Sequence, residues 1–320
     1  MVWKNEPVSH SHLDVPPAAP EVQEVADGVF AYLQLDGQWG LNNTAFLVAS
    51  DGVTLIDTCF TERRTRALLR AIEAISPHPV RTLINTHEHG DHTWGNWLVV
   101  GATIVGHEQC RTGMLESGLL AQSIFPGVDW GAIHLRPPSV TFTDRLEVWV
   151  DDLRMELIAV GPAHTPSDVI GWLPEQRVLI AGDTVFNHGT PFVLMGSVAG
   201  SLAAQERLAA LDASVIVPGH GPVGDARALA DQVEYLRFVQ DLARRGKEAG
   251  LTPLAAALEA RSSGELAGFD GWHNPERLVG NLVRAYAELD VAPPGAPIDM
   301  TAGVAGMVEF NGGQPLRCLA

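Results

Sequence analysis

Side chains that bind metal ions are concentrated in the stretch INTHEHGDHTWGNW, Ile84 to Trp97, directly after an apolar run. In an extended backbone, side chains at positions i and i+2 point the same way, so the rings of His87 and His89 can meet one cation. Asp91 and His92 follow where the chain turns into a helix, and they face a second point nearby. Neutral imidazoles and a carboxylate suit a borderline ion such as zinc.

Three further metal-competent residues follow apolar runs elsewhere in the chain. His164 lies in VGPAHTPSD, Asp183 in LIAGDTVF and His220 in VIVPGHGPV, and each is placed directly after a predicted strand beside Gly or Pro. A single residue of this kind is usually an ordinary loop residue. Four such segments in one chain predict a common site, because strand-end loops on a rigid sheet can hold metal ligands in a fixed geometry.

The elements that must position these residues follow from the periodicity of the apolar residues. Short apolar runs separated by Gly, Asp and Asn predict strands from residue 21 onward, and Thr61 suits the N-cap of a helix over 61–76. The order is β-rich, then α, then β-rich, then α, which favours two sheets packed face to face with helices outside. Further helices are predicted from near 107 and over 201–211, 225–247, 252–260 and 275–290, before a Pro/Gly-rich tail.

Three regions are predicted along the chain. Residues 1–20 are polar and rich in proline, which is typical of a flexible arm. Residues 21–225 carry the metal-binding candidates and form the main domain. Residues 226–320 supply C-terminal helices and a tail, which we expect to pack on the same domain and which offer a surface for a homodimer.

Composition narrows the classes of partner. The net charge of −17 argues against a nucleic acid, because an acidic surface repels a polyanion. The three cysteines lie far apart without a C-x-x-C pair, so neither a disulfide framework nor a cysteine zinc site is expected. No apolar run approaches the ~20 residues that a membrane span needs, and the N-terminus lacks the apolar core of a secretory signal. We therefore expect a soluble cytoplasmic protein that acts on a small molecule.

The set His87-x-His89-x-Asp91-His92, followed by His164, Asp183 and His220, resembles the metallo-β-lactamase superfamily over residues 22–225. The resemblance implies an α/β fold, the four-layer αβ/βα sandwich with a C-terminal helical extension, and a two-metal site at one edge. It assigns His87, His89 and His164 to the first metal, and Asp91, His92 and His220 to the second, with Asp183 bridging. Asp57, in VTLIDT, matches the buried aspartate of the family, which supports the metal loop.

The implied chemistry is hydrolysis. Two cations can share a water and lower its pKa toward neutrality, and the resulting hydroxide attacks a carbonyl or phosphoryl centre. Asp91 is the candidate catalytic residue, because its carboxylate can orient that nucleophile or accept its proton. We expect two zinc ions, with iron or manganese as alternatives, and a thioester, lactone or amide-like carbonyl as substrate.

A looser resemblance suggests an alternative reaction. The form G-D-H-T-W-G-N, with LNNTAFLVASDGVTLIDT upstream, is similar to a group of actinobacterial members that includes cyclase/thioesterases of aromatic polyketide synthesis. In that reading the metals act as Lewis acids in ring closure. An oxygen-using relative with one iron and a catalytically inactive binding protein are further alternatives, and the complete ligand set counts against both.

Three residues outside the ligand set are candidate substrate contacts. Trp94 can line the pocket or pack its helix onto the sheet, and Trp39, in DGQWGLNN, lies in a Gly-flanked hairpin that can hang over the site. His188 follows Asp183 on the same loop, where it can contact substrate or remain an ordinary surface histidine. The loop 121–138, with Phe125, is a second possible lid, and aromatic lids favour an apolar or aromatic substrate.

Overall fold

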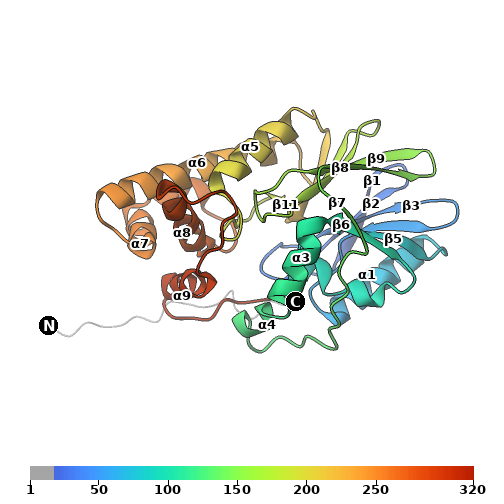
Figure 1. Ribbon diagram of the computed structural model, residues 1–320, viewed down its shortest axis with the longest axis horizontal. Coiled ribbons are helices and arrows are strands. Elements are labelled where there is room, and N and C mark those ends of the chain that lie inside the picture. The colour runs from blue at the N-terminus through green and yellow to red at the C-terminus, as the bar shows by residue number, and fades with distance from the viewer. Residues whose placement is uncertain (1–17) are drawn as a thin grey trace.

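The computed structural model describes residues 18–320 (Figure 1). Of the predicted arm, only residues 18–20 fall within this range; they are exposed and have no regular structure, and the rest of that prediction lies outside the described residues.

The first sheet contains seven strands in sequence order. The four N-terminal strands pair antiparallel, and the later strands continue from β4 in parallel. The strands are β1 (Glu21–Ala26), β2 (Val29–Leu33), β3 (Thr44–Val48), β4 (Val53–Ile56), β5 (Val80–Asn85), β6 (Thr103–His107) and β7 (Val140–Phe142).

Helices connect the parallel strands of this sheet. The longest begins at its predicted cap, because the Thr61 side chain accepts a hydrogen bond from the backbone N–H of Arg64. The connecting elements are α1 (Glu62–Ile75), α2 (Gly90–Thr93), the 3₁₀ turn η1 (Asn96–Leu98), α3 (Glu108–Ser117) and α4 (Ala121–Ile124).

The second sheet has five strands in the order β12-β11-β10-β9-β8. All neighbours are antiparallel except β11 and β12, which run parallel. The strands are β8 (Arg145–Val150), β9 (Leu153–Ala159), β10 (Val169–Leu173), β11 (Val178–Phe186) and β12 (Val215–His220). Asp183 therefore lies within β11 rather than after it, at an irregularity that begins at Gly182, whose φ is +50°.

The two sheets bury a common core, and each is covered by helices on its other face. In β11, Val178 and Ile180 join the core between the sheets, whereas Leu179 and Ala181 face the core beneath α5 (Val198–Ala209) and α6 (Ala226–Glu248). This alternation is the period of two of an extended strand with both faces buried. The predicted four-layer αβ/βα sandwich is confirmed.

The C-terminal part of the chain forms a helical layer at one end of the sandwich (Figure 1). It comprises the end of α6, α7 (Pro253–Ser263), η2 (Glu265–Phe269), α8 (Arg277–Leu289) and α9 (Met300–Phe310). The prediction of an irregular tail is wrong at α9, whose sequence MTAGVAGMVEF carries two glycines, poor helix formers. The helix persists because Asp299 caps it and because Met307 and Phe310 are buried against the neighbouring helices.

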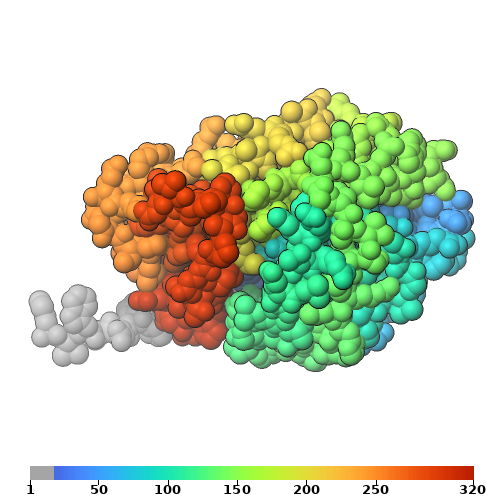
Figure 2. Space-filling view, in the orientation of Figure 1, coloured from blue at the N-terminus to red at the C-terminus, as the bar shows by residue number. Residues whose placement is uncertain are grey.

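The C-terminal helices meet the segment that follows α3 (Figure 2). α4 and α9 approach each other there, since residues of both line one cavity.

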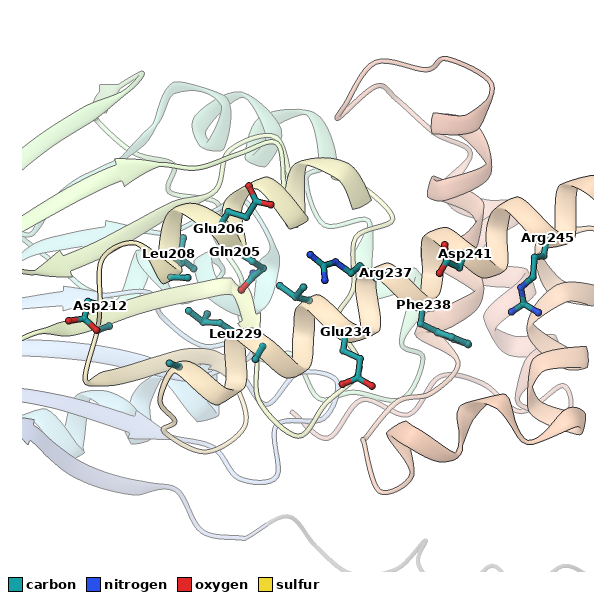
Figure 3. Close-up of a pocket in the computed structure, with 15 residues that line it drawn as sticks. Gln205, Glu206, Leu208, Asp212, Leu229, Glu234, Arg237, Phe238, Asp241 and Arg245 are labelled. Carbon is teal, nitrogen blue, oxygen red and sulfur yellow. The ribbon is translucent and has the colours of Figure 1, made fainter.

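A separate groove of about 870 Å³ lies between α5 and α6, with Leu208 and Leu229 at its base (Figure 3), and no candidate metal ligand lines it. Within residues 18–320, no helix combines the length and the apolar character that crossing a bilayer requires.

Candidate metal centre

Seven predicted ligands meet where strands of both sheets end. The α2 loop after β5 brings His87, His89, Asp91 and His92 from the first sheet. The second sheet contributes the other three from the loop after β9, from β11 and from the last residue of β12: His164, Asp183 and His220.

Potential ligand atoms form three overlapping groups, in each of which all of them lie within 4.8 Å of one another. The groups are His87–His89–His164, His87–His92–Asp183 and Asp91–His92–His220. Asp183 links them: its Oδ2 lies 3.4 Å from Nε2 of both His164 and His220, and its Oδ1 lies 3.0 Å from Nε2 of His92. This is the placement that a carboxylate shared between two cations requires.

Hydrogen bonds on the outer nitrogens orient four of the imidazoles. His92 Nδ1 donates to Asp57 Oδ2 at 2.8 Å, His220 Nδ1 donates to Gly37 O at 3.0 Å, and His164 Nδ1 donates to Phe192 O. In each ring this contact leaves the Nε2 lone pair directed into the cluster, as metal-binding histidines need.

The fourth ring is oriented through a threonine. The Thr86 hydroxyl donates to Asp57 Oδ2 at 2.6 Å, so its oxygen is free to accept from His87 Nδ1 at 3.0 Å. Asp57 also accepts the Thr86 N–H at 2.8 Å. One buried aspartate thus orients both His92 and, through Thr86, His87. His89 differs from the other rings, because its Nδ1 faces His164 Nε2 at 2.8 Å.

Several of the atoms directed inward lack a hydrogen-bond partner. Within residues 18–320 these include His87 Nε2, His92 Nε2 and Asp183 Oδ1, of which the last two lie 3.0 Å apart as an ion pair without hydrogen-bond geometry. Buried polar atoms without partners are costly and rare. Their convergence on one point fits a divalent cation, which would accept all these lone pairs.

The charges around the cluster also fit a cation. Burial lowers the pKa of His87 well below its usual value and that of His164 to about 3, so both rings are neutral and can act as ligands. Burial would likewise lower the pKa of His92, but the carboxylates of Asp183, Asp57 and Asp91 raise it well above its usual value. The negative potential at this point attracts positive charge, whether a proton or a metal ion.

A cavity of about 110 Å³ opens onto the cluster. Its polar lining includes His89, Asp91 and Asp183, and its single arginine is Arg277. The rest is mainly apolar and comes from both ends of the chain: Trp39, Phe60, Phe125, Phe186, Phe192, Met195, Met300, Val304, Met307 and Leu316.

For two of the three candidate substrate contacts, the structure favours the packing or surface alternative. Trp94 is buried behind the cavity wall, where it packs on Phe60 with ring centroids 5.0 Å apart, so it serves packing. His188 is exposed and does not line the cavity, and its backbone φ is +60°. Trp39 does line the cavity.

Sequence reasoning missed the part of the lining that comes from the C-terminal helices. Arg277 and Met307 lie far along the chain from the ligand motifs, and neither stands in a recognisable pattern. Phe125 was singled out as a lid residue, and the structure places it in the cavity wall.

Comparison with known proteins agrees with this geometry. The family model described as the metallo-beta-lactamase superfamily matches residues 37–220, more than half of the chain. The chain belongs to the metallo-β-lactamase superfamily. Members of this superfamily are mostly metal-dependent hydrolases, and the His/Asp cluster lies in the matched region.

Similar members of the superfamily carry different names. The chain is 30% identical over 209 residues to the 2,4-dinitroanisole O-demethylase subunit alpha of a Nocardioides species, covering 64% of this chain and 56% of that one. It is 24% identical over 265 residues to a linear primary-alkylsulfatase of a Pseudomonas species, covering 69% and 50% respectively. The chain thus spans about half the length of these curated relatives.

The fold is also found among solved metallo-β-lactamases. The structure of a metallo-beta-lactamase from Pontibacter korlensis superposes with a TM-score of 0.59 at 24% identity, covering 68% of this chain and 99% of that chain. Its extent leaves the remaining third of this chain without a counterpart.

Proposed function

We propose that this protein is a dinuclear zinc-dependent hydrolase that cleaves an ester-type bond, with a thioester, lactone or amide-like carbonyl as the reacting centre, in a small and largely apolar molecule. The observation that carries the proposal is the convergence of seven ligand-type side chains with inward lone pairs at the floor of an aromatic cavity.

Each part of the centre has a distinct task in this proposal. His87, His89 and His164 would hold one ion and Asp91, His92 and His220 the other, with Asp183 shared. Two bound zinc ions would supply an activated water and polarise the electrophile. Asp91 lines the cavity, and positive charge at the cluster, a protonated His92 without metal or the bound cations with it, keeps its pKa low although burial opposes this. It therefore remains a carboxylate that can orient a water and accept its proton.

Cavity size and lining favour a small substrate. An apolar cavity of about 150 Å³ is enough to bind benzene, so a cavity of about 110 Å³ encloses at most about one ring or a short alkyl chain. The names of the two similar proteins, a 2,4-dinitroanisole O-demethylase subunit and a linear primary-alkylsulfatase, also describe substrates with an aromatic or alkyl body. Cyclisation of a long polyketide chain would need much more room, so this alternative is the weaker one.

The proposal is tested by metal analysis together with ligand variants. We expect about two zinc ions per chain by elemental mass spectrometry, and chelator-sensitive hydrolysis of small aryl esters, thioesters or lactones. The His89→Ala and Asp183→Ala variants should lose hydrolysis by more than about 100-fold, because each removes a metal ligand, while the far-UV circular dichroism spectrum is unchanged.

His188→Ala is the matched control, since this histidine follows Asp183 closely but is exposed and outside the cavity. Its zinc content and rate should equal those of the unmodified protein. Full turnover in His89→Ala or Asp183→Ala, or a chain that binds no zinc after reconstitution, would contradict the proposed function.

A further inference from the structure

Arg277 is a buried cation in the wall of the metal cavity. It is the first residue of α8, outside the segment that matches the family model, and its side chain is 1% exposed. It shares the cavity with Asp91 and Asp183 but belongs to none of the three groups of candidate ligands. It is therefore an addition by the C-terminal helices to the site.

The guanidinium of Arg277 is held in place, but not all of its N–H groups have a hydrogen-bond partner. Its Nη1 donates to Thr190 O at 2.9 Å, and this is its sole side-chain hydrogen bond within residues 18–320. Its Nε is buried without a partner. Its Cζ lies 4.0 Å from the centroid of the Trp39 ring and 5.2 Å from that of Phe186. Stacking fixes the plane of the group and leaves donors at its edge.

No carboxylate of the described residues lies within 4.0 Å of this guanidinium. The adjacent acid, Glu276, is buried and accepts the Trp39 Nε1–H at 2.7 Å. Burial lowers the pKa of Arg277 to about 10, so the group is still a cation at neutral pH. Glu276 favours its charge most, and after it the carboxylates of the metal cluster, Asp183 and Asp91, do so from a distance. Metal ions bound to Asp183 and Asp91 would reduce the negative charge that stabilises the Arg277 cation. An anion bound in the cavity would supply that negative charge again.

A second arginine of α8 shows what a purely structural role looks like. Arg284 is also fully buried and has one nitrogen, Nη1, without a partner, but its Nε donates to Leu194 O at 3.0 Å and its Nη2 to Ala296 O at 2.8 Å. It does not line the metal cavity. Arg284 holds backbone in place, whereas Arg277 combines one such bond with a position in the cavity wall.

We propose that Arg277 forms an anion subsite beside the metal centre, so that the substrate is a small organic anion. Its carboxylate or sulfate binds the guanidinium and its ring or short alkyl body fills the aromatic cavity. The inference rests on the proposed function, whose substrate class it narrows. A guanidinium suits such an oxyanion because its planar fork matches two oxygens with charge-assisted hydrogen bonds.

Ligand binding tests the subsite without turnover. Isothermal titration of the zinc-loaded full chain would compare benzoate and benzenesulfonate with the neutral benzamide, which has a similar size. We expect the anions to bind at least about ten-fold more tightly than benzamide. In Arg277→Met that preference should fall by about ten-fold or more, because a charge-assisted contact is lost, while benzamide affinity changes less than about three-fold. Arg277→Lys, which retains the charge without the fork, should recover part of the preference.

Arg284→Met is the matched control for loss of a buried arginine from the same helix. It is expected to lower stability and to keep the anion preference. If Arg277→Met does not fold, the comparison of Arg277→Lys with the unmodified chain decides. Unchanged anion preference in the folded Arg277 variants, or no preference in the unmodified chain, would overturn the subsite. Zinc content should be measured on the same samples. A chain that binds zinc but shows no anion preference would contradict only the subsite, whereas a chain without zinc would contradict the proposed function.

Discussion

At the scale of single residues, the cluster depends on atoms that never face the cavity. Asp57 accepts hydrogen bonds from Thr86 N, Thr86 Oγ1 and His92 Nδ1, and it does so from a left-handed backbone with a φ of +64°. Because these contacts fix which nitrogen of His87 and His92 points inward, the ligand geometry exists before any ion arrives.

Asp57→Asn should weaken zinc binding while the fold is retained. Asparagine has the same shape and tolerates a positive φ, but its NH₂ group cannot accept, so either Thr86 N–H or both the Thr86 hydroxyl and His92 Nδ1 lose their acceptor. We expect zinc affinity, measured by competition with a chromophoric chelator, to fall about 10- to 100-fold. Asp151→Asn is the control, since Asp151 also has a positive φ of +49° and accepts the Ser50 N–H, but at an exposed turn. Equal zinc affinity in both variants would show that Asp57 does not orient the ligands.

At the scale of elements, α8 supports the segment that forms one wall of the site. Arg277, Asn281 and Arg284 share one face of the helix and bind successive backbone groups of residues 190–194. That segment includes Phe192, whose carbonyl accepts His164 Nδ1. α8 therefore supports the orientation of His164 indirectly, through the backbone of residues 190–194.

Asn281→Ala should loosen this wall. The Asn281 amide accepts Val193 N–H at 2.9 Å and donates to Pro191 O at 2.8 Å and to the Tyr235 hydroxyl at 3.2 Å, so its removal takes a partner from three buried groups. We expect the free energy of unfolding, measured by urea denaturation, to fall by about 2–4 kcal/mol. Asn311→Ala, at the C-terminal cap of α9 and half-buried, should change it by less than about 0.5 kcal/mol. Similar losses in the two variants would contradict the supporting role of α8.

At the scale of the whole molecule, the candidate ligands join the two sheets. His87, His89, Asp91 and His92 follow the first sheet, and the others belong to the second, so a bound ion would link the layers across one edge of the sandwich. Without ions, His87 Nε2 is buried there without a hydrogen-bond partner, which lowers the stability of the folded chain.

Chelation should consequently lower thermal stability as well as activity. A ligand at about 1,000 times its Kd stabilises a folded protein by about 4 kcal/mol, which corresponds to roughly 8–16 °C in Tm for a large domain. Differential scanning calorimetry should show a fall of this order with a strong chelator and recovery with zinc but not with magnesium, which prefers oxygen ligands. An unchanged Tm after verified loss of zinc would mean that the ions do not join the sheets.

The sequence alone predicted the layered fold and the candidate ligand set, because apolar runs and the spacing of His and Asp residues are local features of the chain. Continuous apolar runs such as VTLI and VLIAG specify buried strands, and strand ends in the two sheets place His87, His164 and His220 at one edge of the sandwich. Only the tertiary structure decided which side chains surround that edge. Trp94 and Trp39 are both aromatic and near glycines, yet one is buried in packing and the other faces the cavity. Helix α9 and the position of Arg277 depend on burial against distant partners, which local propensity does not encode.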